Sequence, residues 1–126
     1  MKTFVIAAAM LLIPAAAWAD LAGEVVTAAQ HADYAASATD IATVHAHLHH
    51  TLNCLVGPGG DGFDAKEINP CAGSGKGAIP DAANDAAKLK VLKSAATNAQ
   101  VGIRENNLFT AQQVGAHIAK KLKGLH

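Results

Sequence analysis

The chain has 126 residues, and its ten lysines and arginines balance its ten aspartates and glutamates, so the formal net charge is zero with histidine neutral. This balance excludes the strongly basic surface that binding to nucleic acid or to an anionic membrane requires. A chain of this length forms one small domain with a modest hydrophobic core.

The N-terminal segment, residues 1–19, is predicted to be a signal peptide. Lys2 is followed by an apolar run that closes with Ala-Trp-Ala at residues 17–19, the small-x-small pattern that signal peptidase recognises. We therefore expect a periplasmic or secreted protein in which residues 20–126 form a single helical domain. No other segment reaches the roughly 20 apolar residues of a membrane helix, so no membrane span is expected.

Removal of residues 1–19 would take away both methionines and the single tryptophan, which excludes a thioether site for Cu(I). Lys2 is the only charged residue of the segment, so nine basic and ten acidic residues remain and the formal net charge becomes −1. The aromatic residues that remain, apart from histidine, are Tyr34, Phe63 and Phe109.

Two helices are expected between residues 21 and 56, a region rich in alanine. Apolar residues recur there at intervals of three and four, which is typical of a helix with one buried face. They are Ile41, Val44, Leu48, Leu52 and Leu55. Because Ser37-x-x-Asp40 resembles a capping box, we favour a break near residues 36–40 over one long kinked helix.

Cys54 and Cys71 are the only two cysteines, and an even pair in an exported chain is typical of a disulfide. The alternative, thiolate ligation of a metal, is disfavoured because the spacing is not Cys-x-x-Cys. Residues 57–79 hold seven glycines and two prolines and cannot sustain a helix. We therefore expect an irregular loop that the disulfide closes.

Helix is expected to resume after Pro80, and Arg104 to Leu108 is expected to form a turn. A last helix would begin at a second capping-box match, Thr110-x-x-Gln113. The predicted fold class is therefore all-α, an antiparallel bundle of three to four helices with one Gly-rich loop closed by the disulfide.

Four of the seven histidines lie within six residues of the second predicted helix. They are His45, His47, His49 and His50. Neutral imidazole is the commonest protein ligand for zinc and copper, and four imidazoles in two helical turns lower helix propensity without improving packing. The cluster therefore predicts a metal site in a domain that spans residues 20–126.

The helical repeat divides the cluster into two pairs. His45 and His49, at positions i and i+4, lie beside the buried face and are predicted to be the primary ligands, a spacing that metalloprotease helices use. His117 on the last helix is the predicted third ligand, because a bundle can bring that helix against them. His47 and His50 are predicted to point away and to form an auxiliary site or to be shared across a homodimer.

The helical repeat does not place the other possible metal ligands beside this cluster. On a continuous helix His31 would lie about 21 Å from His45, so we assign it to a separate site or to none. Several carboxylates are candidates for an additional oxygen ligand. They are Glu24, Asp33, Asp40, Asp85 and Glu105.

Three functions are compatible with this pattern. Imidazole without thiolate or thioether favours a Cu(II) or Zn(II) carrier, buffer or resistance factor. A non-covalent haem-binding or electron-transfer bundle using His45 and His117 is the weaker alternative, because three aromatic residues furnish a poor haem pocket. The third is a metal-independent interaction module with a pH-sensitive histidine surface.

No enzyme is predicted. The chain has no Gly-x-Ser-x-Gly nucleophile elbow, and its carboxylates are scattered over predicted helices. The glycine-rich run at residues 73–77 lacks the spacing and the hydroxyl of a phosphate-binding loop. A Cys-x-x-Cys-His motif for covalent haem attachment does not occur.

Overall fold

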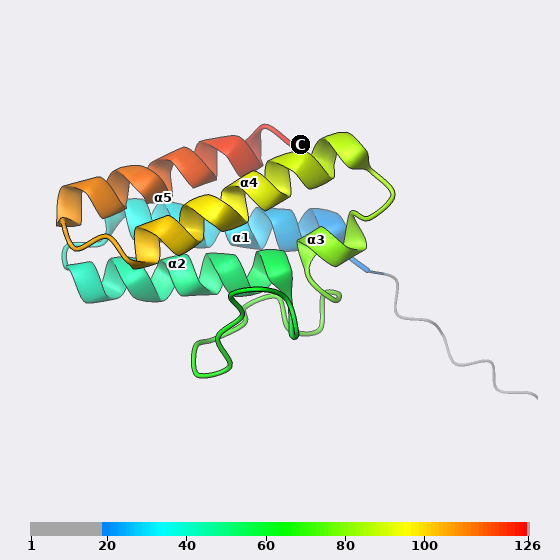
Figure 1. Cartoon of the computed structure of the whole chain (residues 1–126), viewed down its shortest axis with the longest axis horizontal. Coiled ribbons are helices and arrows are strands. Elements are labelled where there is room, and N and C mark those ends of the chain that lie inside the picture. The colour runs from blue at the N-terminus through cyan, green and yellow to red at the C-terminus, as the bar shows by residue number, and fades with distance from the viewer. Residues whose placement is uncertain (1–18, 126) are drawn as a thin grey trace, which may run out of the picture.

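A computed structural model describes residues 19–125, which form five α-helices. Their bounds are Leu21–Ser37 for α1, Ile41–Val56 for α2, Ala78–Asp81 for α3, Ala86–Ile103 for α4 and Leu108–Lys123 for α5. Figure 1 shows the four long helices alternating in direction, with the single-turn α3 at one end. Apart from Ala19, the predicted signal peptide lies outside the described residues.

The long helices surround one hydrophobic core. α1 packs against α2 and α5, and α4 packs against α2 and α5 in turn. A disulfide joins Cys54 at the end of α2 to Cys71, with 5.1 Å between their Cα atoms. The predicted all-α antiparallel bundle with a disulfide-closed loop is therefore confirmed, with four long helices in the described part of the chain.

The apolar periodicity of α2 is its buried face. Ile41 is partly buried and the rest of the predicted stripe is buried completely or almost so. The chain breaks between residues 37 and 41, as predicted, but the cap of α2 is Asp40, whose carboxylate accepts a hydrogen bond from the backbone N–H of Thr43 at 2.9 Å. Ser37 instead ends α1, and its hydroxyl donates to the carbonyl of Asp33.

Two helix starts differ from the predicted ones. Pro80 lies inside the short α3, and α4 begins only after Asp85, whose carboxylate accepts from the N–H of Lys88. α5 begins inside the predicted turn, because Asn107 accepts from the N–H of Thr110 and is the cap. A short side chain that accepts from the third residue of a helix satisfies a backbone donor that would otherwise lack a partner.

The buried face of α1 carries mostly small side chains. Besides Val25 and Glu24, its buried positions are Ala28, Ala29, Ala32 and Ala35. Gly115 of α5 lies so close to this surface that an added Cβ would meet the carbonyl oxygen of Ala32 at 2.9 Å. α1 therefore approaches its neighbours closely, at backbone level.

The chain leaves α2 through Gly57, which has a φ of +69°, a left-handed conformation that favours glycine. A Cβ at Gly57 would collide with the carbonyl oxygen of Lys76, so the loop returns directly against the end of α2. Within residues 19–125, no helix has the length and apolarity needed to cross a membrane.

Candidate metal centre

Three imidazoles converge between the first two helices. His31 comes from α1, and His47 and His50 come from α2. One ring nitrogen of each lies within 4.8 Å of those of the other two, and within residues 19–125 no other three histidine, cysteine or acidic residues meet in this way. Histidine nitrogens at such separations can hold a metal ion.

The antiparallel hairpin explains why these residues meet. Its connection is centred on Thr39, and His31 and His47 lie eight residues before and eight residues after that point. Residues at equal distances from the turn of a helical hairpin lie at the same level. His50 follows His47 by one helical turn, so its ring lies on the same side of α2.

The distances are close to those of a coordinated ion. The Nδ1 atoms of His31 and His47 lie 3.3 Å apart. In tetrahedral geometry, two nitrogens that are each about 2.0–2.1 Å from zinc are separated by about 3.3–3.4 Å. The ring centroids of His31 and His50 are 5.1 Å apart, with the rings nearly perpendicular. The separation of the His31 and His47 nitrogens is therefore the one that a shared ion requires, and a nitrogen of His50 lies within 4.8 Å of both residues.

His50 is the innermost member of the cluster and is 8% exposed. Its Nε2 lies 3.5 Å from a carboxylate oxygen of Glu67. Its Nδ1 is buried and has no hydrogen-bond partner. An unsatisfied buried polar atom costs about 1–3 kcal/mol, so this nitrogen fits a position where a ligand bond is made.

Burial favours the neutral form of all three imidazoles. Burial, followed by the proximity of His50 and His47, lowers the pKa of His31 from 6.5 to about 4. Burial also lowers the pKa of His47, and it lowers that of His50 against the opposing effect of Glu67. A metal ion binds the neutral imidazole, so protons compete little with it near neutral pH.

Tyr34 closes one side of the cluster. Its ring centroid lies 5.5 Å from that of His31 and 5.3 Å from that of His47. Its hydroxyl accepts a hydrogen bond from the side-chain amide of Gln30 at 2.7 Å. The side chain is 44% exposed, so the centre lies near the surface and beside an aromatic ring.

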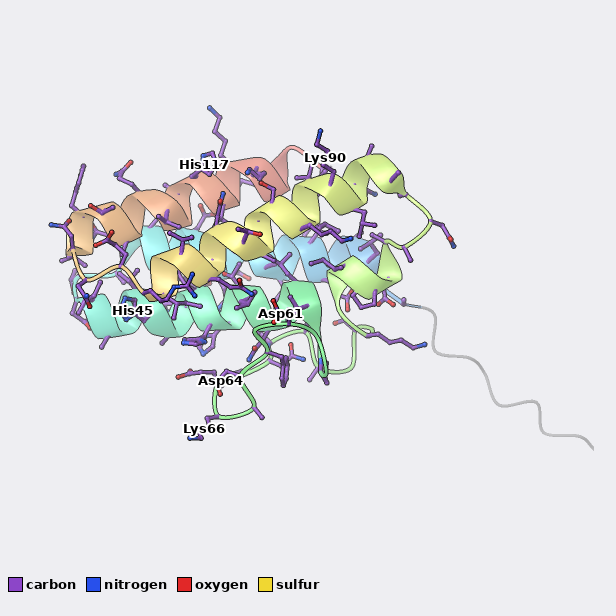
Figure 2. The ribbon with its side chains drawn as sticks, in the orientation of Figure 1. His45, Asp61, Asp64, Lys66, Lys90 and His117 are labelled. Atoms are coloured by element: carbon purple, nitrogen blue, oxygen red, sulfur yellow. A yellow bond between two sulfur atoms is a disulfide. The ribbon has the colours of Figure 1, made fainter. Side chains whose placement is uncertain are left out.

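The structure does not group the three predicted principal ligands. His45 Nε2 donates to the backbone carbonyl of Glu105 at 2.7 Å, which ties α2 to the connection between α4 and α5. His49 Nδ1 is buried and lies 4.0 Å from a carboxylate oxygen of Asp64, too far for a hydrogen bond. His117 is exposed on α5, and Figure 2 shows it on the opposite side of the bundle from His45.

The helical repeat correctly placed His47 and His50 on one face of α2, but His50 does not point into solvent as predicted. The reason is that α1 and the loop after α2 cover that face. His31, assigned to a separate site or none, is brought in because the break before Asp40 folds α1 back. The equal spacing of His31 and His47 around Thr39 is the pattern that would have indicated this.

The carboxylates that were predicted as possible oxygen ligands of the metal make other contacts. Asp40 and Asp85 cap helices, and Asp33 pairs with Lys123 at 2.6 Å. Glu105 accepts from the N–H of Asn107. Glu24 is fully buried and accepts from the N–H of Gly77. The carboxylate that does reach the cluster, Glu67, was not among the predicted ones.

The sequence matches no protein-family model, and comparisons with curated proteins and with solved structures gave no significant match.

Proposed function

We propose that the protein binds one divalent transition-metal ion, Cu(II) or Zn(II), through His31, His47 and His50, and that it acts as a carrier, buffer or resistance factor for that ion. The observation that carries the proposal is the convergence of three imidazoles from two helices, with ligand nitrogens within 4.8 Å of one another.

The donor set supports this choice of ions. Three imidazole nitrogens without sulfur suit Zn(II) and Cu(II), and the intrinsic order of affinities places Cu(II) first. Three histidines also leave a fourth position for water or an exchanging ligand. Cys54 and Cys71 are bonded to each other and supply no thiolate.

The location of the centre supports exchange of the ion. His31 and His47 are only half-buried, and Tyr34 beside them is exposed. The fold has its own core and a disulfide, so the ion is not needed as the principal structural element. An open, partly accessible site on a stable scaffold favours a protein that takes up and releases its ion.

An exported location is part of the proposal. It is supported by the pattern of residues 1–19 and by the disulfide, because such bonds form in oxidising compartments. The haem alternative loses support because His45 and His117 lie on opposite sides of the bundle. A surface that charges near pH 6 is disfavoured because the pKa values of His31, His47 and His50 are lowered.

Competition titration tests the proposal. Residues 20–126 are titrated with Cu(II) and Zn(II) against a chromogenic chelator, and the wild type is expected to bind one equivalent more tightly than micromolar. Replacing His31, His47 or His50 by alanine is expected to weaken binding by about 100-fold, equivalent to about 2.7 kcal/mol.

His117→Ala and His45→Gln are the matched controls, because each removes an imidazole from outside the cluster. Both are expected to bind like the wild type. Wild-type binding no tighter than micromolar, or loss of binding confined to the two controls, would overturn the proposal.

A further inference from the structure

The loop closed by the disulfide, residues 54–71, carries two carboxylates to the histidines of α2. Glu67 lies 3.5 Å from His50 and Asp64 lies 4.0 Å from His49, measured between the nearest oxygen and nitrogen. Figure 2 shows Asp64 on this loop beside α2. Of the two contacts, the one to His50 involves a residue of the three-histidine cluster.

The position of the loop is determined by Asn53, one helical turn beyond His50. The side chain of Asn53 is fully buried, and its Nδ2 donates to the carbonyls of Asp64 at 2.9 Å and Ile68 at 3.2 Å. Its Oδ1 accepts from the N–H of Asp64 at 2.9 Å. These bonds hold the backbone on both sides of Glu67 against α2, and the disulfide closes the same loop.

The two ring nitrogens of His50 therefore lie in different environments. Nε2 faces the carboxylate of Glu67, whereas Nδ1 is buried without a partner. A carboxylate attracts an N–H and repels a lone pair, so it favours the tautomer with the proton on Nε2. The lone pair is then on Nδ1, the nitrogen that lacks a hydrogen-bond partner.

We propose that Glu67 is the positioning residue of the metal centre: it holds the proton on Nε2 of His50 and so presents Nδ1 to the ion. The inference rests on the proposed function and deepens it. A carboxylate behind a ligating imidazole fixes the tautomer and the ring orientation and makes the nitrogen a stronger donor. The loop of residues 54–71 would then supply a residue that contacts a metal ligand, although it does not contact the ion itself.

Metal titration of three variants tests the role of Glu67. Glu67→Ala is expected to weaken Cu(II) and Zn(II) binding by about 10–100-fold. Glu67→Gln is expected to lose less, because its amide oxygen can accept a hydrogen bond from Nε2. Asp61→Asn is the matched control, since it removes a negative charge from the same loop at a residue 3.5 Å from Gln100 of α4, and wild-type binding is expected.

A second measurement uses the metal-free protein. Nitrogen NMR of the imidazole rings is expected to show His50 with its proton on Nε2 in the wild type, and a mixture of the two tautomers in Glu67→Ala. A change in folding alone would not alter the tautomer of one ring while the circular dichroism stays the same.

The outcomes separate the two proposals. Wild-type-like metal binding by Glu67→Ala, or a wild-type His50 with its proton on Nδ1, overturns the role of Glu67 alone. Absence of metal binding by the wild type overturns the proposed function, and the role of Glu67 with it.

Discussion

The Nδ1 atoms of His31 and His47 lie 3.3 Å apart across the contact between α1 and α2. An ion at this point would connect the two helices and would bind the folded chain only. Because a ligand that binds only the folded state stabilises it, free zinc at 100 times its Kd is expected to raise the free energy of unfolding by about 2.7 kcal/mol. For a domain of this size, the midpoint temperature of thermal unfolding would rise by about 10–20 °C, which circular dichroism measures. An equal rise in His31→Ala would contradict binding at this site.

Tyr34 supplies a direct optical test. It is the only tyrosine of the chain, and the only tryptophan lies in the predicted signal peptide, so emission from residues 20–126 that is excited in the tyrosine absorption band comes from Tyr34 alone. Its ring lies 5.3 Å from that of His47. Cu(II) is paramagnetic and is expected to quench most of this emission with one equivalent, whereas Zn(II) is diamagnetic and is expected to quench little. His50→Ala should lose the quenching, and undiminished quenching in that variant would place the copper elsewhere.

The disulfide is expected to contribute to both stability and affinity. Replacing Cys54 and Cys71 by alanine removes a bond between residues with a sequence separation of 17, which is expected to lower the free energy of unfolding by about 3 kcal/mol. Chemical denaturation with and without zinc measures the change. Because Asn53 still holds the loop, the metal affinity should fall less than in Glu67→Ala. If the variant with both cysteines replaced is as stable as the wild type, the disulfide does not constrain the unfolded chain.

Glu24 gives the stability a distinctive pH dependence. Burial, partly offset by the N–H of Gly77, raises the pKa of Glu24 from 4.5 to about 7. Between these values the folded chain holds a proton that the unfolded chain has lost, so the free energy of unfolding falls as the pH rises. Glu24→Gln is expected to be about 2 kcal/mol more stable than the wild type above the folded pKa, with Glu105→Gln as the control.

The same variant exposes the contribution of His31. The lowered pKa of His31 means that the unfolded chain binds a proton before the folded chain does, between pH 6.5 and about 4. In this range the stability therefore rises with pH, opposite to the effect of Glu24. Urea denaturation of metal-free Glu24→Gln as a function of pH is expected to show the rise, and adding His31→Gln should reduce it, because the lowered pKa values of His47 and His50 contribute a rise of the same sign. A flat profile in Glu24→Gln alone would contradict the burial of a neutral His31.

His45 is expected to affect stability without affecting metal binding. Its Nε2 donates to the carbonyl of Glu105, and losing such a bond at a partly buried carbonyl costs about 1 kcal/mol. His45→Ala should therefore unfold at lower urea concentration while titrating with Cu(II) like the wild type. A loss of metal affinity larger than the loss of stability would restore His45 as a ligand.

The helices and the disulfide were predictable because their causes are local. The stripe from Val44 to Leu55 needs only the helical repeat, and Cys54 had one possible partner. Helix starts were less well predicted. The capping-box motif pointed to Ser37 and Thr110, whereas Asp40 and Asn107, which do not match that motif, are the residues that cap the helices.

The candidate site was harder to predict because it depends on which helices meet. The spacing of His47 and His50 places them on one face, but it does not state what covers that face. His31 joins them only through the fold of the hairpin, and Glu67 only through the bonds of Asn53. Both contacts join separate elements of the fold. The periodicity of residues within one helix does not predict such contacts.

The small side chains of α1 have a chemical consequence. The hydroxyl of Thr51 on α2 lies within hydrogen-bond distance of two carbonyl oxygens, that of His47 in its own helix at 3.0 Å and that of Ala28 on α1 at 3.3 Å, so one hydroxyl spans the gap between the helices. Ala28 and Ala32 lie one turn before His31 and next to it. A bulkier residue engineered at Ala28 to fill the interior is therefore expected to push α1 away from α2 and to separate His31 from the imidazoles of α2.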